Sequence, residues 1–425
     1  MTAAAPGWLV NRAYARLWWG QSVSALGDDM FTVTAALWAG TVIAAGHPWA
    51  PAAVSGLAAA AAIAVTVTGP AAGLLADRYD RRMVLAGTEL VRAVVAAALA
   101  GMSFIPASAL PAGAWLAALY AAVLVLNGAG QVFVPAQLAM TSVLVPGEKD
   151  RVRAAALTEA AGSAAGIFGP LAAGPLMLAA GVHAALIINA ITYLVSLASA
   201  WSLPRSPGSR SSGGLRQEFA AGLRAFTASS LLPALTIVTV ICQLGTGTVT
   251  ALNFFAVTRD LHGSPGAYAV AEAVMGAGYL GGAVAAGRLV RKAGPRVVIC
   301  GGLLAAGVLV AGYAVQRDLA AGLAVLACYA AMLGLLNTAV APMLMSSVPT
   351  EYLGRAMAVF RPAGQAAAAI SALGSGWAAS ALRGWHAAGG NGAITVILLA
   401  GAALIITAGI RAAVALPGQA AAGAR

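Results

Sequence analysis

The residues of this chain that could do chemistry are carboxylates placed inside long apolar runs. Most of the 13 acidic residues occupy polar stretches, but five interrupt the apolar runs: Asp28, Asp29, Glu89, Glu159 and Glu272. A charge at membrane depth is costly, so such a side chain usually faces a cavity, pairs with a cation or takes up a proton. These positions therefore predict groups that bind a proton or a cation reversibly.

Asp28 is the acid that we expect closest to the middle of its run. It lies ~12 residues into a predicted span over 16–45, which at 1.5 Å per residue is ~18 Å. Asp29 is its neighbour and points ~100° away, so the two cannot both face one cavity squarely. Two interpretations of Asp28 stay open: a group that exchanges protons or cations, or a static partner of Arg92 or of the predicted span over 113–142.

The remaining acids differ in their surroundings. Glu272 lies in the outer half of a predicted span with no cation nearby in sequence, and is a second candidate for proton coupling or for binding a cationic ligand. Glu159 begins another span and either faces a vestibule there or has no such role. Glu89 and Arg92 are three residues apart, so they share a helix face, and we expect them mainly to neutralise each other.

Other chemistry is poorly represented. Cys242, Cys300 and Cys328 are widely spaced inside apolar runs, and the four histidines fall in separate predicted loops, so neither a disulfide framework nor a metal site is expected. No GxxxxGK[ST] phosphate loop is present, which argues against ATP as an energy source. We expect no cofactor and no enzymatic activity.

The elements that hold these acids are membrane helices. Of the 425 residues, 60% are hydrophobic and 9% charged, and the mean hydropathy is +0.86. A soluble protein could not bury this much apolar surface, and each helix that crosses the ~30 Å bilayer core needs ~20 apolar residues. Twelve spans are predicted, over 16–45, 51–76, 83–104, 113–142, 153–180, 182–203, 231–257, 265–290, 296–315, 318–346, 354–382 and 390–412.

The basic residues predict how the chain is oriented. In the twelve-span arrangement 20 of the 24 Lys and Arg fall on one side, Arg259, Arg317 and Arg383 fall on the other, and Arg92 lies inside a span. Basic residues favour the cytoplasmic side, so both termini are expected in the cytoplasm, with the protein in the cell inner (plasma) membrane. The formal charge of +11 thus reflects topology and anionic lipid rather than a nucleic-acid partner.

A polar linker divides the chain into two halves. Residues 204–229 combine a Gly/Ser/Pro-rich stretch with a short amphipathic helix expected on the cytoplasmic membrane face, between an N-terminal half (1–203) and a C-terminal half (230–425). SALGDD at 24–29 matches CQLGTG at 242–247, and GLLADRYDRR at 73–82 matches GRLVRKAGPR at 287–296. Parallel repeats of six spans usually enclose a central cavity.

The charged turn at 73–82 carries a family resemblance. Together with NRAYARLWWGQSVSALGDD at 11–29, GSAAGIFGPLAAGP at 162–175 and VPTEYLGRAMAV at 348–359, it resembles the major facilitator superfamily, and most closely its branch of macrolide-efflux and enterobactin-export proteins. The resemblance covers the whole chain. It implies an all-α membrane protein with twelve transmembrane helices in two six-helix pseudo-symmetric halves, the major facilitator fold.

The resemblance also implies gating residues. Asp77 would pair with Arg355 to latch the halves on the cytoplasmic side, Gly73 would let helix ends approach, and the stretch with Gly166, Gly169 and Pro170 would form a tight hinge in helix 5. The alternative is that the loop only sets topology and the glycines only pack. The basic residues of the loop are expected to face lipid headgroups or carboxylates; they are Arg78, Arg81 and Arg82.

The resemblance fails at one point, and it leaves milder cavity candidates. Drug/proton antiporters of this superfamily often carry an arginine in helix 4, where this chain has LVLNGAGQV at 124–132, without arginine. Polar or aromatic side chains expected either to line a cavity or merely to pack are Trp38, Asn127, Gln131, Gln243, Thr246 and Tyr329.

Three functions follow as hypotheses. The first is a secondary active transporter, a monomer that exports a bulky amphipathic drug, antibiotic or siderophore-like compound in exchange for protons by alternating access. The second is an uptake carrier or facilitator for a small nutrient, which the Ala/Gly/Val-rich interior disfavours. The third, a membrane-embedded enzyme, has no supporting motif.

Overall fold

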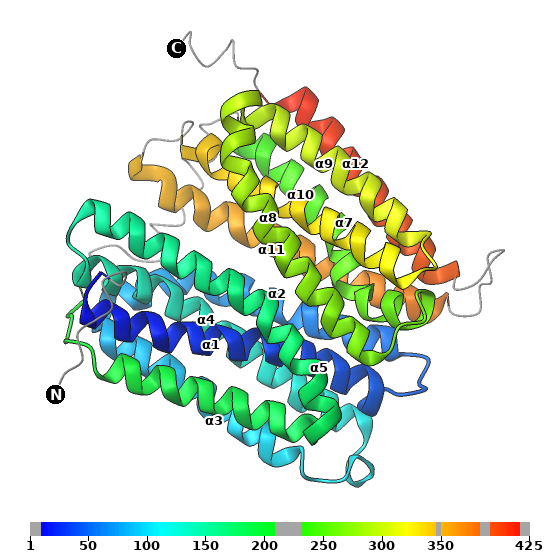
Figure 1. Ribbon diagram of the computed structural model, residues 1–425, viewed down its shortest axis with the longest axis horizontal. Helices are drawn as coiled ribbons and strands as arrows, with labels where there is room; N and C mark the ends of the chain where they lie inside the picture. Colours follow the sequence, from blue (N-terminus) through cyan, green and yellow to red (C-terminus); the bar gives the residue numbers. More distant parts are fainter. Residues whose placement is uncertain (1–9, 209–230, 346–349, 383–391, 417–425) are drawn as a thin grey trace. The chain divides into compact units, whose positions relative to one another are not determined.

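The computed structural model describes residues 10–208, 231–345, 350–382 and 392–416, with no account of the side chains at 70, 341–359 and 361. In this part of the chain every regular element is a helix (Figure 1). The elements are α1 (Arg12–Trp38), η1 (Ala39–Ile43), α2 (Ala50–Arg78), α3 (Arg81–Met102), η2 (Ala107–Ala109), α4 (Ala112–Leu144), α5 (Glu148–Trp201), α7 (Leu231–Phe255), η3 (Ala256–Asp260), α8 (Pro265–Ala293), α9 (Pro295–Ala314), α10 (Leu319–Met345), α11 (Thr350–Ala381) and α12 (Gly392–Ala415). The predicted linker helix lies outside the described residues.

Helix α5 contains two of the predicted membrane spans. It runs for 54 residues but breaks at Gly181, where φ is 75° and ψ is 174°, a backbone conformation that glycine adopts readily. The predicted boundary between the spans at 153–180 and 182–203 coincides with this break. Pro170 lies inside the first segment, so the sharp turn of the chain is at the glycine and not at the proline.

The lengths of the helices suit a bilayer. Nine of the described helices are long and apolar enough to cross a membrane, α5 being counted once. Helices α1 and α11 are not among the nine. The apolar run of α1 is interrupted by Gln21, Ser24, Asp28 and Asp29, and these polar residues line the cavity described below.

The chain separates into two compact units. Unit 1 comprises Met1–Trp38 and Val67–Gly213, and unit 2 comprises Ala39–Thr66 and Gly214–Arg425. The first part of α2 therefore packs within unit 2, where the backbone N–H of Ala52 donates to Ser380 Oγ at 3.2 Å. The predicted halves 1–203 and 230–425, with the linker at 204–229, remain a prediction.

The centre of unit 1 is α1, which lies between the two segments of α5 (Figure 1). Tyr14 donates from its hydroxyl to the carbonyl of Ala154, 2.7 Å away, in the first segment. Against the second segment α1 presents Gly27, where a Cβ would lie 2.1 Å from Thr192 Oγ1. This close contact on both sides fixes α1, and with it the acids that α1 carries.

Helix α1 and helix α7 both end in a π-helical segment. Ala44 N–H donates to Ala39 C=O at 2.8 Å after α1, and Leu261 N–H donates to Ala256 C=O at 3.0 Å after α7. Each bond joins residues five apart, as in a π-helix. The two bonds are 217 positions apart, close to the offset of 218 between SALGDD and CQLGTG.

Within unit 2, α8 and α10 touch through their backbones. A Cβ built on Gly282 would lie 1.8 Å from the carbonyl oxygen of Ala331, whereas one built on the adjacent Gly281 would meet nothing within 4 Å. A methyl group at 282 therefore requires the helices to separate, and the same change at 281 does not.

We expect Gly282→Ala to lower the melting temperature of the detergent-purified protein, because the backbone of α10 cannot give way cheaply. Gly281→Ala is the matched control and should hold or slightly raise it, because alanine favours a helix over glycine by ~1 kcal/mol. Thermal unfolding of both variants beside the parent measures this. Equal melting temperatures for the two variants would contradict the packing described for α8 and α10.

Candidate functional site

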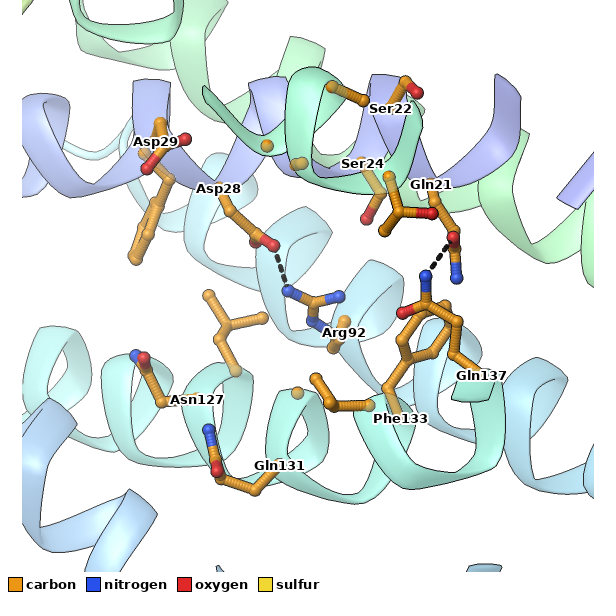
Figure 2. Close-up of a pocket in the computed structure, with 18 of the residues that line it drawn as sticks. Gln21, Ser22, Ser24, Asp28, Asp29, Arg92, Asn127, Gln131, Phe133 and Gln137 are labelled. Carbon is orange, nitrogen blue, oxygen red and sulfur yellow. Dashed lines mark hydrogen bonds and ion pairs between the residues drawn. The ribbon is translucent and has the colours of Figure 1, made fainter. Parts of the chain in front are cut away.

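The described part of unit 1 contains a cavity of about 400 Å³, lined from α1, α3, α4 and α5 (Figure 2). Its wall is rich in polar groups. Those on α1 are Gln21, Ser22, Ser24, Asp28, Asp29 and Thr32, and those on the other helices are Arg92, Asn127, Gln131, Gln137 and Thr158. The expectation of an interior with few polar groups is therefore wrong for this cavity.

Helix periodicity explains the polar wall on α1. Gln21, Ser24, Asp28 and Thr32 are spaced by three or four residues, so they follow one face of the helix. Opposite this face, Gln137 of α4 donates from its side-chain amide to Gln21 Oε1. Neither glutamine was among the predicted cavity residues.

The middle of the wall is an ion pair between Asp28 and Arg92 (Figure 2). Arg92 Nη2 donates to Asp28 Oδ2, and the Tyr193 hydroxyl donates to Asp28 Oδ1. The guanidinium carbon also lies 4.4 Å from the centre of the Tyr193 ring. The side chain of Arg92 is 8% exposed and that of Asp28 is 38% exposed, so the acid is the more accessible member of the pair.

Glu89 stands behind this pair. Its side chain is 0% exposed, and Arg92 Nη1 lies 3.5 Å from its Oε1. The predicted pairing of Glu89 with Arg92 is thus confirmed, but Arg92 serves Asp28 as well. The pairing with Arg92, one of the two open interpretations of Asp28, is what the structure shows, and the exchange of protons or cations remains a prediction.

The other predicted residues of unit 1 divide into two groups. Asn127 and Gln131 line the cavity, as does Asp29, which Figure 2 shows directed away from Arg92. Glu159 is exposed and does not line the cavity. Trp38 is buried and packs edge-on against Trp115, with ring centres 5.6 Å apart, so it serves as a packing residue there.

The charged turn after α2 binds the segment that follows α5. The backbone N–H of Arg81 donates to Ser206 C=O at 2.9 Å, and Arg81 Nη1 donates to Ser206 Oγ at 3.2 Å. The guanidinium of Arg82 lies 5.4 Å from the ring centre of Trp201. Arg81 and Arg82 are thus held by protein groups rather than by headgroups alone, whereas Asp77 and Arg78 are exposed.

The predicted latch and hinge are only partly described. The side chain of Arg355 lies outside the described residues, so its pairing with Asp77 stays a prediction. A Cβ on Gly169 would lie 2.8 Å from Asp29 Cβ, so this glycine of α5 does touch α1. Cβ atoms on Gly73 and Gly166 would meet no described atom within 4 Å, and the close helix approach expected at these two positions stays a prediction; Pro170 is buried.

Unit 2 holds a second acid with different partners. Asn253 of α7 donates from its amide to Glu272 Oε1 at 2.7 Å, and the Tyr313 hydroxyl donates to Asn253 Oδ1 at 2.8 Å. Among the described residues no cation lies within ion-pair distance of Glu272. Asn253 and Tyr313 were not predicted, because an amide and a phenol in apolar runs read as ordinary packing.

The remaining predicted residues of unit 2 do not join Glu272 in a described site. Thr246 lies 3.3 Å from Gln243, from hydroxyl oxygen to amide oxygen, and Tyr329 is fully buried. The described residues contain no group of three His, Cys, Asp or Glu side chains that could hold a metal ion. The chemistry available is therefore the binding of cations, protons and hydrogen-bonding groups.

Comparison with known proteins identifies the family. The profile of the Major Facilitator Superfamily matches residues 17–372 and 235–422. The uncharacterized MFS-type transporter YfiS of Bacillus subtilis (strain 168) is 29% identical over 185 residues, which are 44% of this chain and 40% of that protein. The putative bacilysin exporter BacE of Bacillus amyloliquefaciens is 35% identical over 127 residues, 30% of each protein. The matched segments thus span less than half of these relatives.

Solved structures agree on the fold. The nucleoside transporter NupG superposes with a TM-score of 0.73 at 11% identity, covering 96% of this chain and 100% of that one. A D-xylose-proton symporter superposes with a TM-score of 0.72 at 16% identity, covering 94% and 98%. These likenesses confirm the predicted all-α fold with twelve membrane helices. With the profile matching most of its length, the chain belongs to the major facilitator superfamily, and it is a multi-pass membrane protein.

Proposed function

We propose that this protein is a proton-coupled exporter, an antiporter that moves a bulky amphipathic drug, antibiotic or siderophore-like compound out of the cell by alternating access. It would act as a monomer in the inner membrane with both termini in the cytoplasm. The observation that carries the proposal is Asp28, a carboxylate at the wall of a polar cavity that is paired with a buried arginine.

An acid in this position can couple two ligands. A proton and a cationic group of a substrate would compete for Asp28, so binding one displaces the other. The amides of Asn127 and Gln131 could hold polar groups of the substrate, and Trp18, Phe31 and Leu126 offer apolar surface in the same wall. This mixed lining suits an amphipathic molecule.

Export is the direction that the similarity to the putative bacilysin exporter supports. An uptake carrier for a small nutrient is the second candidate. The polar lining of the cavity and the fold shared with a D-xylose-proton symporter favour it. The proposed pair of Asp77 and Arg355 would latch the cytoplasmic side in either direction.

The two candidates differ in what the cell accumulates. An efflux-deficient host that expresses the protein should tolerate higher doses of some compounds in a panel of cationic, neutral and anionic amphipathic drugs. A protonophore should remove that tolerance, because the proton gradient drives the export. Unchanged tolerance for the whole panel, or faster entry of a labelled nutrient, would favour the uptake carrier.

A further inference from the structure

The cluster beside the cavity holds a second carboxylate, which the proposed function does not use. Glu89 Oε1 accepts hydrogen bonds from the hydroxyls of Ser196, at 2.9 Å, and Ser24, at 3.4 Å. Its Oε2 is buried and has no hydrogen-bond partner among the described residues. An ionised carboxylate with an unpartnered buried oxygen is costly, and a neutral carboxylic acid is much less so. These surroundings suit a Glu89 that holds a proton.

Asp28 has the opposite surroundings. Both of its carboxylate oxygens accept a hydrogen bond, one from Arg92 and one from the Tyr193 hydroxyl. Its side chain is also open to the cavity. Donors reach both oxygens of Asp28, whereas one oxygen of Glu89 has no hydrogen-bond partner among the described residues.

Arg92 is one cation facing two acids. It contacts Asp28, and its Nη1 lies 3.5 Å from Glu89 Oε1. Inside a membrane protein the combinations without net charge are favoured, because an uncompensated buried charge is costly. Three combinations are neutral: protonated Glu89 with the Arg92–Asp28 pair, protonated Asp28 with the Arg92–Glu89 pair, or both acids ionised with Arg92 and a second cation present. The hydrogen bonds to both oxygens of Asp28 and the unpartnered Oε2 of Glu89 favour the first over the second.

We infer that Glu89 carries the exchanged proton and that Arg92 passes between Asp28 and Glu89, so that the cavity exchanges one proton for one monocationic substrate. The inference rests on the proposed exchange of a proton for a substrate and names the substrate class as a monocation. It assigns the proton to Glu89 in place of Asp28, and Asp28 keeps the role of binding the cation. When the cation of the substrate binds Asp28, the displaced guanidinium pairs with Glu89, whose O–H bond breaks and releases its proton to solvent. Protonation of Glu89 reverses these steps and expels the cation.

The other groups around the cluster do not disturb this charge balance. Helix α5 contributes Tyr193 and Ser196, both uncharged, and the polar groups of α4 in the cavity wall are amides. Of the described residues that line the cavity, Asp29 adds the one further charge, and Figure 2 shows it directed away from Arg92.

Infrared spectroscopy of the purified full chain in lipid tests the inference without a substrate. The parent should show the C=O band of a buried carboxylic acid at neutral pH, and the component of this band that Glu89→Gln removes is that of Glu89. Any contribution of Glu272, which has no cation within ion-pair distance among the described residues, stays in both spectra. Asp28→Asn should lose the Glu89 component as well, because Arg92, no longer paired with Asp28, stabilises the ionised form of Glu89. Asp29→Asn is the matched control and should keep it. Tetraphenylphosphonium, a monocation, should remove this component from the parent, and the neutral triphenylphosphine oxide should not.

Each outcome has a separate meaning. A parent spectrum without the band, or a band that Glu89→Gln leaves unchanged, would overturn the assignment of the proton to Glu89. If the component that Glu89→Gln removes persists in Asp28→Asn, Arg92 does not move between the two acids. If Glu89→Gln does not fold, the band of the parent and its response to the two probes decide. Efflux of tetraphenylphosphonium by the same parent sample tests the exporter independently. If the sample transports this cation but shows no band, the proposed export stands and the role of Glu89 is overturned.

Discussion

Replacing Asp28 with asparagine is expected to abolish proton-driven efflux while leaving the protein folded in the membrane. The amide is nearly the same size, but it cannot exchange a proton or attract a cation. Arg92 keeps Glu89 as a partner at 3.5 Å, so the buried guanidinium is not left without an acid. Substrate uptake into inverted vesicles, in which export runs inward, is measured across a range of pH and should fall to the level of vesicles that lack the protein.

Asp29→Asn is the control for this variant. Asp29 also lines the cavity, but it points away from Arg92 in Figure 2 and lies about a quarter-turn from Asp28. Its replacement should lower efflux less and keep the pH dependence. An unchanged pH profile in Asp28→Asn would remove Asp28 from the coupling and leave that role to Glu89, Glu272 or Glu159.

Removal of Arg92 should damage both stability and transport. Arg92→Gln leaves two acids without their cation, and breaking a fully buried ion pair costs about 3–5 kcal/mol. Because the side chain of Asp28 is 38% exposed, water in the cavity offsets part of this cost, and we expect a loss of about 2–3 kcal/mol in the free energy of unfolding. Chemical unfolding in detergent, followed by tryptophan fluorescence, measures it.

A double variant separates the charge from the packing of Arg92. Asp28→Asn combined with Arg92→Gln removes both charges and keeps an amide pair in their place, so most of the lost stability should return. Transport should not return, because the carboxylate that binds the cation of the substrate is gone. Equal stability of the single and the double variant would mean that Arg92 acts by its contact with Tyr193 rather than by its charge.

The acids of the site could be predicted from the sequence, but their partners could not. Asp28, Asn127 and Gln131 stand out because polar side chains are rare in apolar runs of this length. Whether Asp28 meets Arg92 depends on how α1 packs against α3, and no periodicity within one helix reports that. Tyr193 gave no signal at all, because a tyrosine inside an apolar run usually packs through its ring.

One part of the missed site did have a local signal. The spacing of Gln21, Ser24, Asp28 and Thr32 marks a polar face on α1, and reading it would have added Gln21 and Ser24 to the cavity residues. Gln137 could not be found in this way, because it is recognised only by its contact with Gln21. The predicted boundary between the spans at 153–180 and 182–203 falls at Gly181, where the backbone conformation has a local cause, because glycine adopts a positive φ readily.

The π segments after α1 and α7 bear on the history of the chain. In each segment the backbone N–H donates to the carbonyl five residues back, whereas in an α-helix it donates to the carbonyl four residues back. Each hydrogen-bonded loop therefore encloses one more residue than in the α-helix before it. The same extra residue occurs at matching places, 217 positions apart, although the sequences AGTVI and AVTRD have little else in common. The simplest ancestry is a single insertion in a primordial six-helix gene, inherited by both copies when that gene duplicated and fused. The π segment would then be older than the present protein, which carries it twice.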